Sequence, residues 1–425
     1  MILLLFAALA VFIVIGLPIA LALAGASLVY VIVSGTVPPL VVVHRMVAGV
    51  DSFPLLAVPF FILAGNLMNS TGITARIFAF AQAMVGWMRG GLGHVNVGAS
   101  VLFAGMSGAA VADAGGLGAI EIKAMRDAGY DTDFSIGVTA ASSTIGPLIP
   151  PSLPMVIYGV LASASIGQLF AAGVIPGLLM AVALMVMVHF YAKRRNYQRG
   201  APFSFGILFY TFRRAFLSLV TPGIIIGGIL LGIMTPTEAA IGAVAWALFL
   251  GCVVYRNLTF RSFFRVSMES LETTVVIMFV VAAASIFSWV LTQNRVPEMF
   301  ALLVSSSTDN PYIILLVINL ILFIVGCFME TVAAITILVP VLLPLAISAG
   351  VDPVQFGVIM VLNLMLGLLT PPVGMVLYIL AKVSNVTFEE SARATMPFII
   401  PLLVVLGLVT FIPALSMWLP TLLYR

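Results

Sequence analysis

The sequence predicts an all-α polytopic membrane protein, and two features of its composition lead to this prediction. Hydrophobic residues make up 62% of the 425 residues and charged residues only 8%, whereas about a quarter of a soluble domain is charged. Apolar windows of about 20 residues, the length that an α-helix needs to cross hydrocarbon, recur along the chain. A porin-type barrel is excluded because its strands are short and alternating. The formal net charge of +3 is small, and we expect a lipid bilayer and no nucleic acid as a partner.

The N-terminal segment, residues 1–33, reads as a membrane helix and not as a signal peptide. No basic residue precedes its apolar run, which continues beyond the length of a signal-peptide core. We expect this helix to bend near Pro18. The two cysteines, Cys252 and Cys327, lie in separate apolar runs, so neither a disulfide framework nor a metal site is expected.

Basic residues orient the middle of the chain. Nine of the 18 Lys and Arg residues lie in two clusters between Lys193 and Arg265, and basic loops face the cytoplasm. The apolar chain between the clusters must therefore cross the membrane and return, turning near residues 235–238. Residues 256–272 and 386–395 mix apolar and charged residues as amphipathic helices at the membrane interface do.

An internal repeat organises the rest of the chain. The tetrapeptide AGYD at 128–131 recurs as AGVD at 349–352, an offset of 221 residues. The same offset aligns Gly105 with Gly326, Gly146 with Gly367, and Pro150-Pro151 with Pro371-Pro372. The second copy then lacks one residue, so that MVIY (155–158) aligns with MVLY (375–378). An ordered series of matches at one offset indicates a duplicated structural unit.

The repeat predicts inverted topology. Five crossings separate the two Pro-Pro pairs if the apolar stretches near Ser107 and Glu330 are re-entrant hairpins, and an odd number turns the second unit upside down. Inverted repeats with discontinuous helices are typical of secondary transporters. Backbone is broken at membrane depth only where it is buried in protein or lines a cavity. We therefore expect an inverted repeat with two re-entrant hairpins and two discontinuous helices.

The breaks combine hydroxyl groups with carbonyl oxygens that Gly and Pro release, and hard cations prefer oxygen ligands. The candidate cation ligands are Ser107, Gly108, Ser142, Ser143, Thr144 and Gly146 in the first repeat, and Gly326, Glu330, Thr331, Asn363, Met365, Gly367 and Thr370 in the second. The candidate substrate ligands are Ser107, Asp113, Ser152 and Glu330. Na⁺ is the preferred ion, and H⁺ bound through Asp113 or Glu330 is the alternative, because an acid inside a span is costly and typically functional.

Each candidate also has a structural interpretation. Gly and Ser on membrane helices often serve close packing, and the prolines are compatible with simple kinks. Glu238 lies at a predicted turn, where a helix-capping or salt-bridge role explains this residue at least as well as contact with a substrate does. The functional interpretation is favoured because hydroxyls, Gly and Pro-Pro occur together twice, in register.

The motifs resemble those of the large, DctM-type membrane subunit of tripartite ATP-independent periplasmic (TRAP) transporters, over essentially the whole chain. The resemblance rests on GMSGAAVADAGGLGAIEIKAMRDAGYD, IGPLIPPS, MTPTEAAIGAV and LGLLTPPVGMVLY. It implies a scaffold plus an elevator-type transport domain that imports an organic acid across the bacterial inner membrane, driven by Na⁺. It also implies a small four-helix membrane subunit and a periplasmic substrate-binding protein as partners. The substrate class includes sialic acids and C4-dicarboxylates, and the sequence looks most similar to the sialic-acid type with separate membrane subunits.

The resemblance implies hairpin tips at 107–113 and 329–334 and unwound loops at 142–151 and 363–372. We expect five parts: N-terminal scaffold helices (1–92), a first transport repeat (93–167), scaffold helices with an interfacial arm (168–310), a second transport repeat (311–384), and a second arm with the C-terminal scaffold helix (385–425). No cofactor other than Na⁺ as coupling ion is expected.

An intramembrane enzyme, a passive channel and a purely structural subunit are the alternatives, together with a proton-coupled carrier. An enzyme needs a nucleophile with a base, or two acids on facing spans. The repeat aligns Asp113 with Ala334 and Glu330 with Ala109, so it predicts no symmetric acid pair and no catalytic residue.

Overall fold

The computed structural model describes residues 2–305, 308 and 310–424, without the side chains of Ser107 and Ser305. Within these residues the chain is built from helices, and one isolated β-bridge joins Arg89 to Arg199. Eight helices are long and apolar enough to cross a membrane in this part of the chain. Large apolar side chains such as Phe209, Leu320 and Ile400 are about 60% exposed on the outer helices, as lipid-facing side chains are. The predicted all-α polytopic membrane fold is confirmed.

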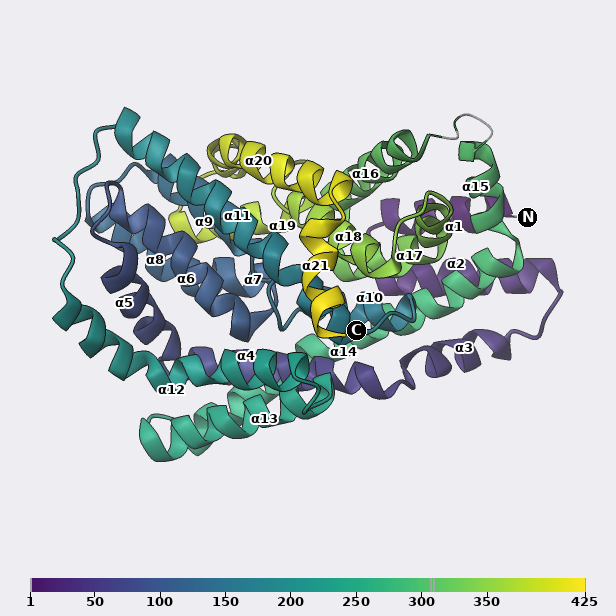
Figure 1. Cartoon of the computed structure of the whole chain (residues 1–425). Coiled ribbons are helices and arrows are strands. Elements are labelled where there is room, and N and C mark those ends of the chain that lie inside the picture. Colours follow the sequence, from purple (N-terminus) through teal and green to yellow (C-terminus); the bar gives the residue numbers. More distant parts are fainter. Residues whose placement is uncertain (1, 306–307, 309, 425) are drawn as a thin grey trace.

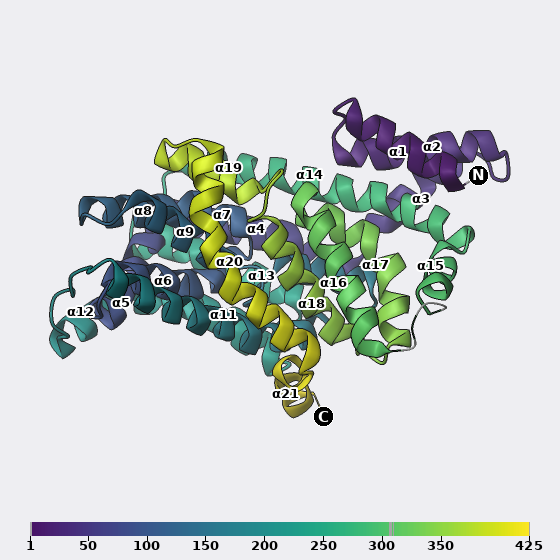
Figure 2. The same ribbon diagram turned by 90° about the horizontal axis from the view of Figure 1, so that it is seen from above.

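The N-terminal segment forms a helical hairpin, so the predicted single helix bent near Pro18 is wrong. Helix α1 (Ile2–Val14) ends before Gly16, which has a left-handed φ of +85°, and α2 (Ile19–Ser34) begins after Pro18. The two helices pack side by side (Figure 2). Because Gly16 reverses the chain where proline alone only kinks it, α1 is left with 13 residues, too few to cross about 30 Å of hydrocarbon.

The first repeat contains a helical hairpin followed by a broken helix. The hairpin comprises α6 (Gly91–Ser107), the short α7 (Ala110–Ala112), the π-helical segment η2 (Asp113–Leu117) and α8 (Gly118–Asp127). The broken helix comprises α9 (Thr132–Ser143) and α10 (Leu153–Leu161). Between α9 and α10 the chain is non-helical but buried, which is the condition under which irregular backbone is tolerated at membrane depth.

The second repeat has the same order of elements. Its hairpin comprises α16 (Pro311–Phe328) and α17 (Thr331–Ser348), and its broken helix comprises α18 (Pro353–Gly367) and α19 (Met375–Ser384). Both Pro-Pro pairs contain a cis peptide bond. Asp131 and Asp352, aligned by the repeat, occupy the N-cap positions of α9 and α18. The two units predicted from the sequence offset are therefore two copies of one supersecondary structure.

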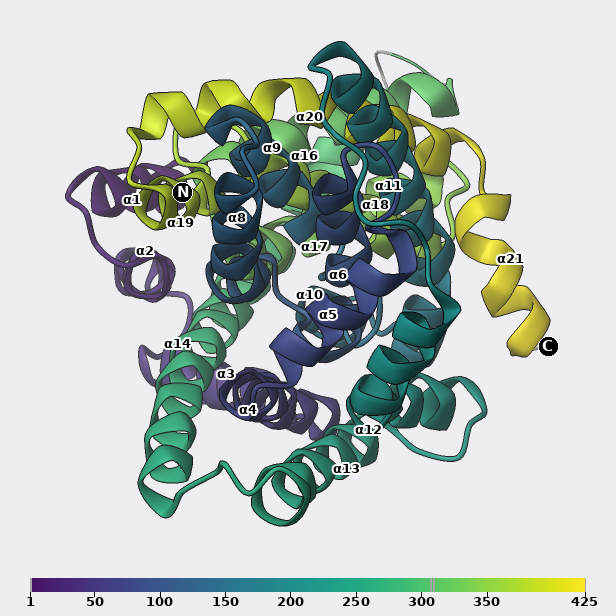
Figure 3. The same ribbon diagram turned by 90° about the vertical axis from the view of Figure 1, so that its left-hand side faces the viewer.

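The remaining helices surround these repeats (Figure 3). They are α3 (Leu40–Val50), η1 (Phe53–Leu56), α4 (Ala57–Ser70) and α5 (Ile73–Val85) before the first repeat; α11 (Ile166–Arg194), α12 (Phe205–Leu230), α13 (Pro236–Phe249), η3 (Leu250–Val254), α14 (Phe260–Gln293) and α15 (Val296–Ser305) between the repeats; and α20 (Phe388–Phe411) and α21 (Ala414–Leu423) after the second. In Figure 3, α12, α13, α14 and α20 lie at the periphery, and α6, α8, α9, α10 and α17 of the repeats lie inside.

The predicted interfacial segments are not separate helices. Residues 260–272 form the first part of α14, which has 34 residues, and residues 388–395 begin α20. At 1.5 Å per residue α14 is about 51 Å long, about 20 Å more than the hydrocarbon thickness. The charged first part of α14 therefore continues the same helix as its apolar part, which alone is long enough to cross the hydrocarbon.

The two hairpins approach the centre of the molecule from opposite ends. In Figures 1 and 2, α6 and α8 lie at the left and α16 and α17 at the right, with the broken helices between them. The second half of each broken helix packs on the hairpin of the other repeat: α10 on α17, and α19 on η2 and α8. This exchange is what a pseudo-twofold relation between inverted repeats produces.

Candidate functional site

The first break is lined by hydroxyl groups from the end of α9. Ser143 Oγ donates to the Ala140 carbonyl at 2.8 Å, and Thr144 Oγ1 donates to the Ala141 carbonyl at 2.6 Å. Ser142 Oγ donates to Asn96 Oδ1 on α6 at 2.6 Å. Each hydroxyl donates its hydrogen to an oxygen atom of the protein, so the lone pairs of its own oxygen remain available to accept a hydrogen bond or to bind a cation. Gly146 follows in the buried loop, so the candidate cation ligands Ser142, Ser143, Thr144 and Gly146 lie together.

The tip of the first hairpin contacts this break directly. Gly108 has a left-handed φ of +60°, and a Cβ there would lie 2.4 Å from the Pro151 carbonyl oxygen. Only glycine fits both the conformation and the close approach. Ser152 caps α10: its Oγ accepts from the Met155 N–H at 3.2 Å and donates to the Pro147 carbonyl. Ser107 ends α6, and its side chain lies outside the described residues.

The second break has an even closer contact between hairpin and loop. A Cβ on Gly367 would lie 2.3 Å from the carbonyl carbon of Gly326, so the backbones of α16 and α18 touch at this pair. The Val373 N–H donates to the Cys327 carbonyl at 3.2 Å, which joins the loop after Pro372 to the hairpin tip. Met365 is buried beside Gly367. Each hairpin tip therefore rests on the break of its own repeat.

The polar candidates of the second repeat lie at or near this contact. Glu330 is the N-cap of α17, and its Oε2 accepts from the N–H groups of Val332 and Ala333 at 2.9 and 3.2 Å. Thr331 is buried, and its Oγ1 has no hydrogen-bond partner among the described residues. Thr370 Oγ1 donates to the Leu366 carbonyl at 2.9 Å. Glu330 itself is exposed at the surface of the chain.

Each repeat links its broken helix to its hairpin through an asparagine that sequence reasoning missed. In the second repeat, Asn363 Nδ2 donates to the backbone carbonyl and Oδ1 of Asn319 on α16, at 2.9 and 2.8 Å. In the first, Ser142 donates to Asn96 on α6. Ser142 and Asn363 are aligned by the offset of 221, so the two bonds are equivalent. Asn96 and Asn319 fall two positions out of that register, which is why the offset did not reveal them.

Sequence reasoning also missed a buried carboxyl group beside Asp113. Asp113 opens η2 and Glu121 lies on α8, and each residue is 1% exposed. The spacing of eight residues equals one π turn plus one α turn, so both side chains fall on one helix face. The spacing of the two acids is visible in the sequence, but it places them on one face only if the helix contains a π turn. Asp113, predicted as a substrate ligand, is enclosed by protein in this conformation.

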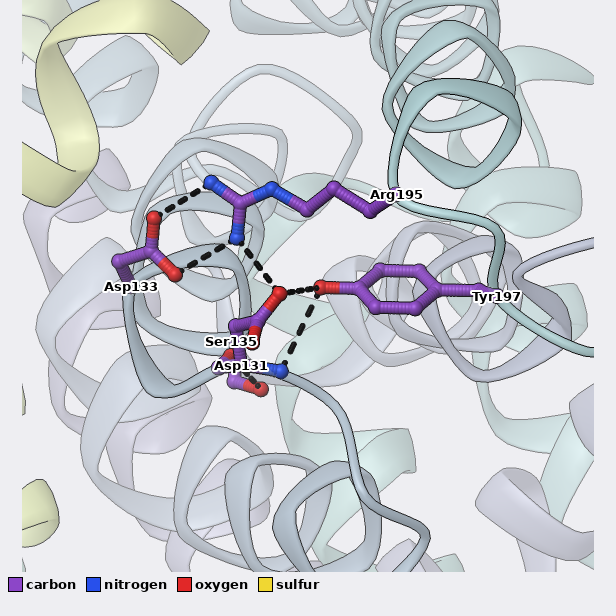
Figure 4. Close-up of polar contacts among 5 residues, drawn as sticks. All are labelled: Asp131, Asp133, Ser135, Arg195 and Tyr197. Atoms are coloured by element: carbon purple, nitrogen blue, oxygen red, sulfur yellow. Dashed lines mark hydrogen bonds and ion pairs between the residues drawn. The ribbon is translucent and has the colours of Figure 1, made fainter.

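A hydrogen-bonded group of polar and charged residues lies where α9 begins, close to the basic residues that follow α11 (Figure 4). Arg195, just after α11, forms two hydrogen bonds to Asp133, at 2.8 and 2.6 Å, and one to Asp131 at 2.9 Å. Tyr197 Oη donates to the same Asp131 carboxylate at 2.6 Å. The Arg195 hydrogen bonds hold the pKa of Asp133 below its usual range, and burial together with Asp131 raises the pKa of Tyr197 to about 12. These contacts attach the loop after α11 to the start of α9.

We expect Arg195→Ala to free this loop with little change in global stability. Exposed ion pairs contribute at most about 1 kcal/mol, but the amide groups of residues 195–204 should exchange with deuterium faster at pH 7. Arg194→Ala is the control, since Arg194 forms no ion pair in the described part of the chain. The wild type should show the same loosening on acidification: a lowered pKa means that the contact is complete above the ordinary value of 3.8 and is lost as the pH falls through the folded value. Equal exchange in both variants would contradict the assignment.

Comparisons with known proteins place this architecture in a family. The sialic acid TRAP transporter large permease protein SiaM of Vibrio cholerae is 49% identical over 407 residues, which cover 96% of this chain and 95% of that protein. The sialic acid TRAP transporter permease protein SiaT of Haemophilus influenzae is 44% identical and covers 96% of this chain and 66% of that longer protein. The C4-dicarboxylate TRAP transporter large permease protein DctM of Pseudomonas aeruginosa is 40% identical over 87% of each chain. These relatives are named as permeases and not as enzymes.

A solved structure and a family model agree with these relatives. The YdaH transporter of Alcanivorax borkumensis shares the fold, with a TM-score of 0.67 over 88% of each chain and 11% sequence identity. The family model described as the DctM component of tripartite ATP-independent periplasmic transporters matches residues 6–415. The chain, a multi-pass membrane protein, therefore belongs to the DctM family of TRAP transporter components.

Proposed function

We propose that this chain is the transporting subunit of a Na⁺-driven importer for an organic acid of the sialic acid or C4-dicarboxylate class. The observation that carries the proposal is the pair of breaks, each offering oxygen atoms and each contacted by the hairpin of its own repeat. Oxygen ligands with little fixed charge suit a monovalent hard cation. Two such sites in inverted repeats are the arrangement expected of a secondary transporter.

The coupling mechanism follows from the contact between tip and break. A cation held by the oxygens of Ser143, Thr144 and Gly146 would draw the first break and Gly108 together; Gly326, Thr331 and Gly367 would do the same in the second repeat. Substrate would then bind to tips that the cations have ordered, through Ser107, Ser152 or Glu330. The repeats would move against the outer helices as one body, which is the elevator motion.

The partners and location in this proposal come from the family. A tripartite system supplies a small membrane subunit of four helices and a periplasmic substrate-binding protein, and it works in the bacterial inner membrane. A sialic acid is favoured over a C4-dicarboxylate because the sialic acid relatives are 49% and 44% identical and the C4-dicarboxylate relative 40%.

Uptake into proteoliposomes tests the proposal. The chain and its small subunit are reconstituted, the binding protein is added outside, and radiolabelled sialic acid or succinate is supplied with or without an inward Na⁺ gradient. Accumulation that needs both the gradient and the binding protein is the expected result. Accumulation driven by a pH gradient alone would replace Na⁺ with H⁺, and equilibration without accumulation would indicate a channel.

The double variant Ser143→Ala, Thr144→Ala should raise the Na⁺ concentration for half-maximal uptake by about tenfold, the lower end of what a disturbed metal site costs. The control is Ser135→Ala, which removes a hydroxyl from the same helix, α9, where it donates to the Asp131 carbonyl away from the break. An unchanged Na⁺ dependence in the double variant would remove Ser143 and Thr144 from the cation site.

A further inference from the structure

A cavity of about 740 Å³ lies beside the charged group of Figure 4, outside the two breaks. Its walls come from the end of α5, the start of α6, the loop between α8 and α9, and residues 195–201 after α11. In Figure 1, α5, α6, α8 and α9 lie together at the left. Exposed side chains such as Gln82 and Arg199 line the cavity, so it is open to the outside. Its volume falls in the range of small-molecule sites, roughly 300–1,000 Å³.

Close backbone contacts fix the wall that carries Arg199. A Cβ at Gly200 would collide with the Gly86 carbonyl oxygen, so only glycine fits there. Arg89 Nε donates to the Tyr197 carbonyl at 3.3 Å, and the isolated β-bridge joins Arg89 to Arg199. The bridge uses the backbone of Arg199, and the side chain of Arg199 forms no hydrogen bond or ion pair within the described chain. Its guanidinium is therefore available to a ligand.

The chain around the cavity carries an excess of positive charge. Residues 193–214 contain six basic residues and no acid, and the next acid along the chain is Glu238. Within the described chain, Arg195 is the one of the six that forms ion pairs, with Asp131 and Asp133. Because basic loops face the cytoplasm, the excess charge faces the leaflet whose anionic lipids give it a negative surface potential.

The guanidinium of Arg199 suits a phosphate group. Its N–H donors form a planar fork that binds phosphate oxygens through two parallel hydrogen bonds. A basic residue that only orients a span needs exposure and no cavity around it. Arg194 and Arg199 are both exposed, but of the two only Arg199 lines the cavity. Basic pockets between membrane helices on the cytoplasmic side are typical of lipid headgroup sites.

Aromatic side chains place the cavity at the height of the lipid headgroups. Trp87 follows Gly86, which lines the cavity, and stacks edge to face on Phe203 with ring centroids 6.4 Å apart. Trp87 and Phe203 are both half exposed, and tryptophan is enriched where hydrocarbon meets the headgroups. The exposed rings of Phe209 and Phe216 lie seven residues apart, on one face of α12. Acyl chains can therefore lie against α12 while the headgroup reaches the cavity.

We infer that this cavity binds the phosphate group of an anionic phospholipid from the cytoplasmic leaflet, with Arg199 as its main ligand. The side chains of Gln82 and Gln198, which also line the cavity, supply amide groups for the remaining polar atoms of the headgroup. A bound lipid then contacts α5, the base of the first hairpin and the loop that leads to α12. The inference goes beyond the proposed transport function and does not rest on it.

Binding of defined lipids to the full chain tests this inference. The chain is purified in detergent, and native mass spectrometry counts bound lipids while phosphatidylglycerol or phosphatidylcholine with the same acyl chains is titrated. Arg199→Gln removes the charge without breaking a hydrogen bond or ion pair of the described chain. Arg199→Lys keeps the charge and loses the planar fork. Arg261→Gln, which removes an exposed charge from α14 in the second basic cluster, is the matched control.

The wild type and the Arg261 control should each bind one phosphatidylglycerol more tightly than phosphatidylcholine, because choline adds a positive charge among basic residues. Arg199→Gln should weaken the binding of that phosphatidylglycerol by about tenfold or more, the least that a hydrogen bond to a charged group contributes. Arg199→Lys should fall between the wild type and Arg199→Gln. Equal weakening by Arg199→Gln and Arg261→Gln, or equal affinity of the wild type for the two lipids, overturns the inference.

A soluble phosphate ester is the other source of the same chemistry, and a competition arm distinguishes it from a lipid. Glycerol 3-phosphate is added at the concentration of the phosphatidylglycerol, which should remain bound. Displacement of the lipid at equal concentration would assign the cavity to a soluble phosphate and also overturn the inference. The measurement uses no substrate, partner protein or Na⁺ gradient, so its result and that of the uptake experiment are independent.

Discussion

Gly367→Ala is expected to abolish uptake and to destabilise the chain by about 1–3 kcal/mol, the usual effect of overpacking a close contact. The added Cβ would lie 2.3 Å from the Gly326 carbonyl carbon and 2.6 Å from its oxygen, and backbone atoms cannot rotate away as a side chain can. The hairpin tip must then separate from the second break, and the oxygens that both contribute lose their geometry. Uptake in proteoliposomes and the thermal unfolding midpoint measure the two effects.

Two other glycines make this a graded experiment. A Cβ on Gly326 would approach Gly367 Cα to 3.3 Å, so Gly326→Ala should have a smaller effect of the same kind. Gly223, inside α12, has no atom within 4 Å of its added Cβ, and Gly223→Ala should be neutral or stabilising, since alanine favours a helix by about 1 kcal/mol. Equal behaviour of the Gly367 and Gly223 variants would show that the tip and the break need not touch.

The fold was predictable because its strongest signals are local or periodic. Length and hydropathy predict membrane helices without reference to tertiary structure, and a repeat at one offset reveals two copies of a motif. The wrong prediction at Pro18 and the joined segments at 260–272 and 388–395 share a cause: how a helix ends depends on a few residues such as Gly16 and on what packs nearby. Composition does not contain that information.

The site was predictable only where the repeat marked it. Gly326 and Gly367 were found from the offset, although nothing in the sequence showed that they touch. Asn96, Asn319 and Glu121 were missed because they belong to one repeat or fall out of register. The repeat aligns no second acid with Asp113, but Glu121, an acid that belongs to the first repeat alone, lies eight residues further along the chain. A π turn is a tertiary feature that α-helical periodicity does not anticipate.

Glu330→Gln is expected to lower Na⁺-driven uptake by at least about tenfold, which is about 1.4 kcal/mol of lost interaction, while membrane insertion and stability stay near wild type. Glu330 caps α17 through Oε2, and glutamine keeps an amide oxygen that can accept the same two hydrogen bonds. Only the negative charge next to the second break is removed. Glu330→Ala removes the cap as well, which should cost a further 1 kcal/mol or so in stability.

Glu238 provides the matched control for this charge. It caps α13 by accepting from the Thr235 N–H at 2.7 Å, so Glu238→Gln makes the same chemical change at a helix start outside the two repeats. Uptake by the Glu238 variant should equal that of the wild type. If the Glu330 variant also transports normally and only Glu330→Ala is impaired, then Glu330 acts through its hydrogen bonds to the helix. The cation site of the second repeat would then consist of the neutral oxygens of Thr331, Thr370 and the backbone near Gly326 and Gly367.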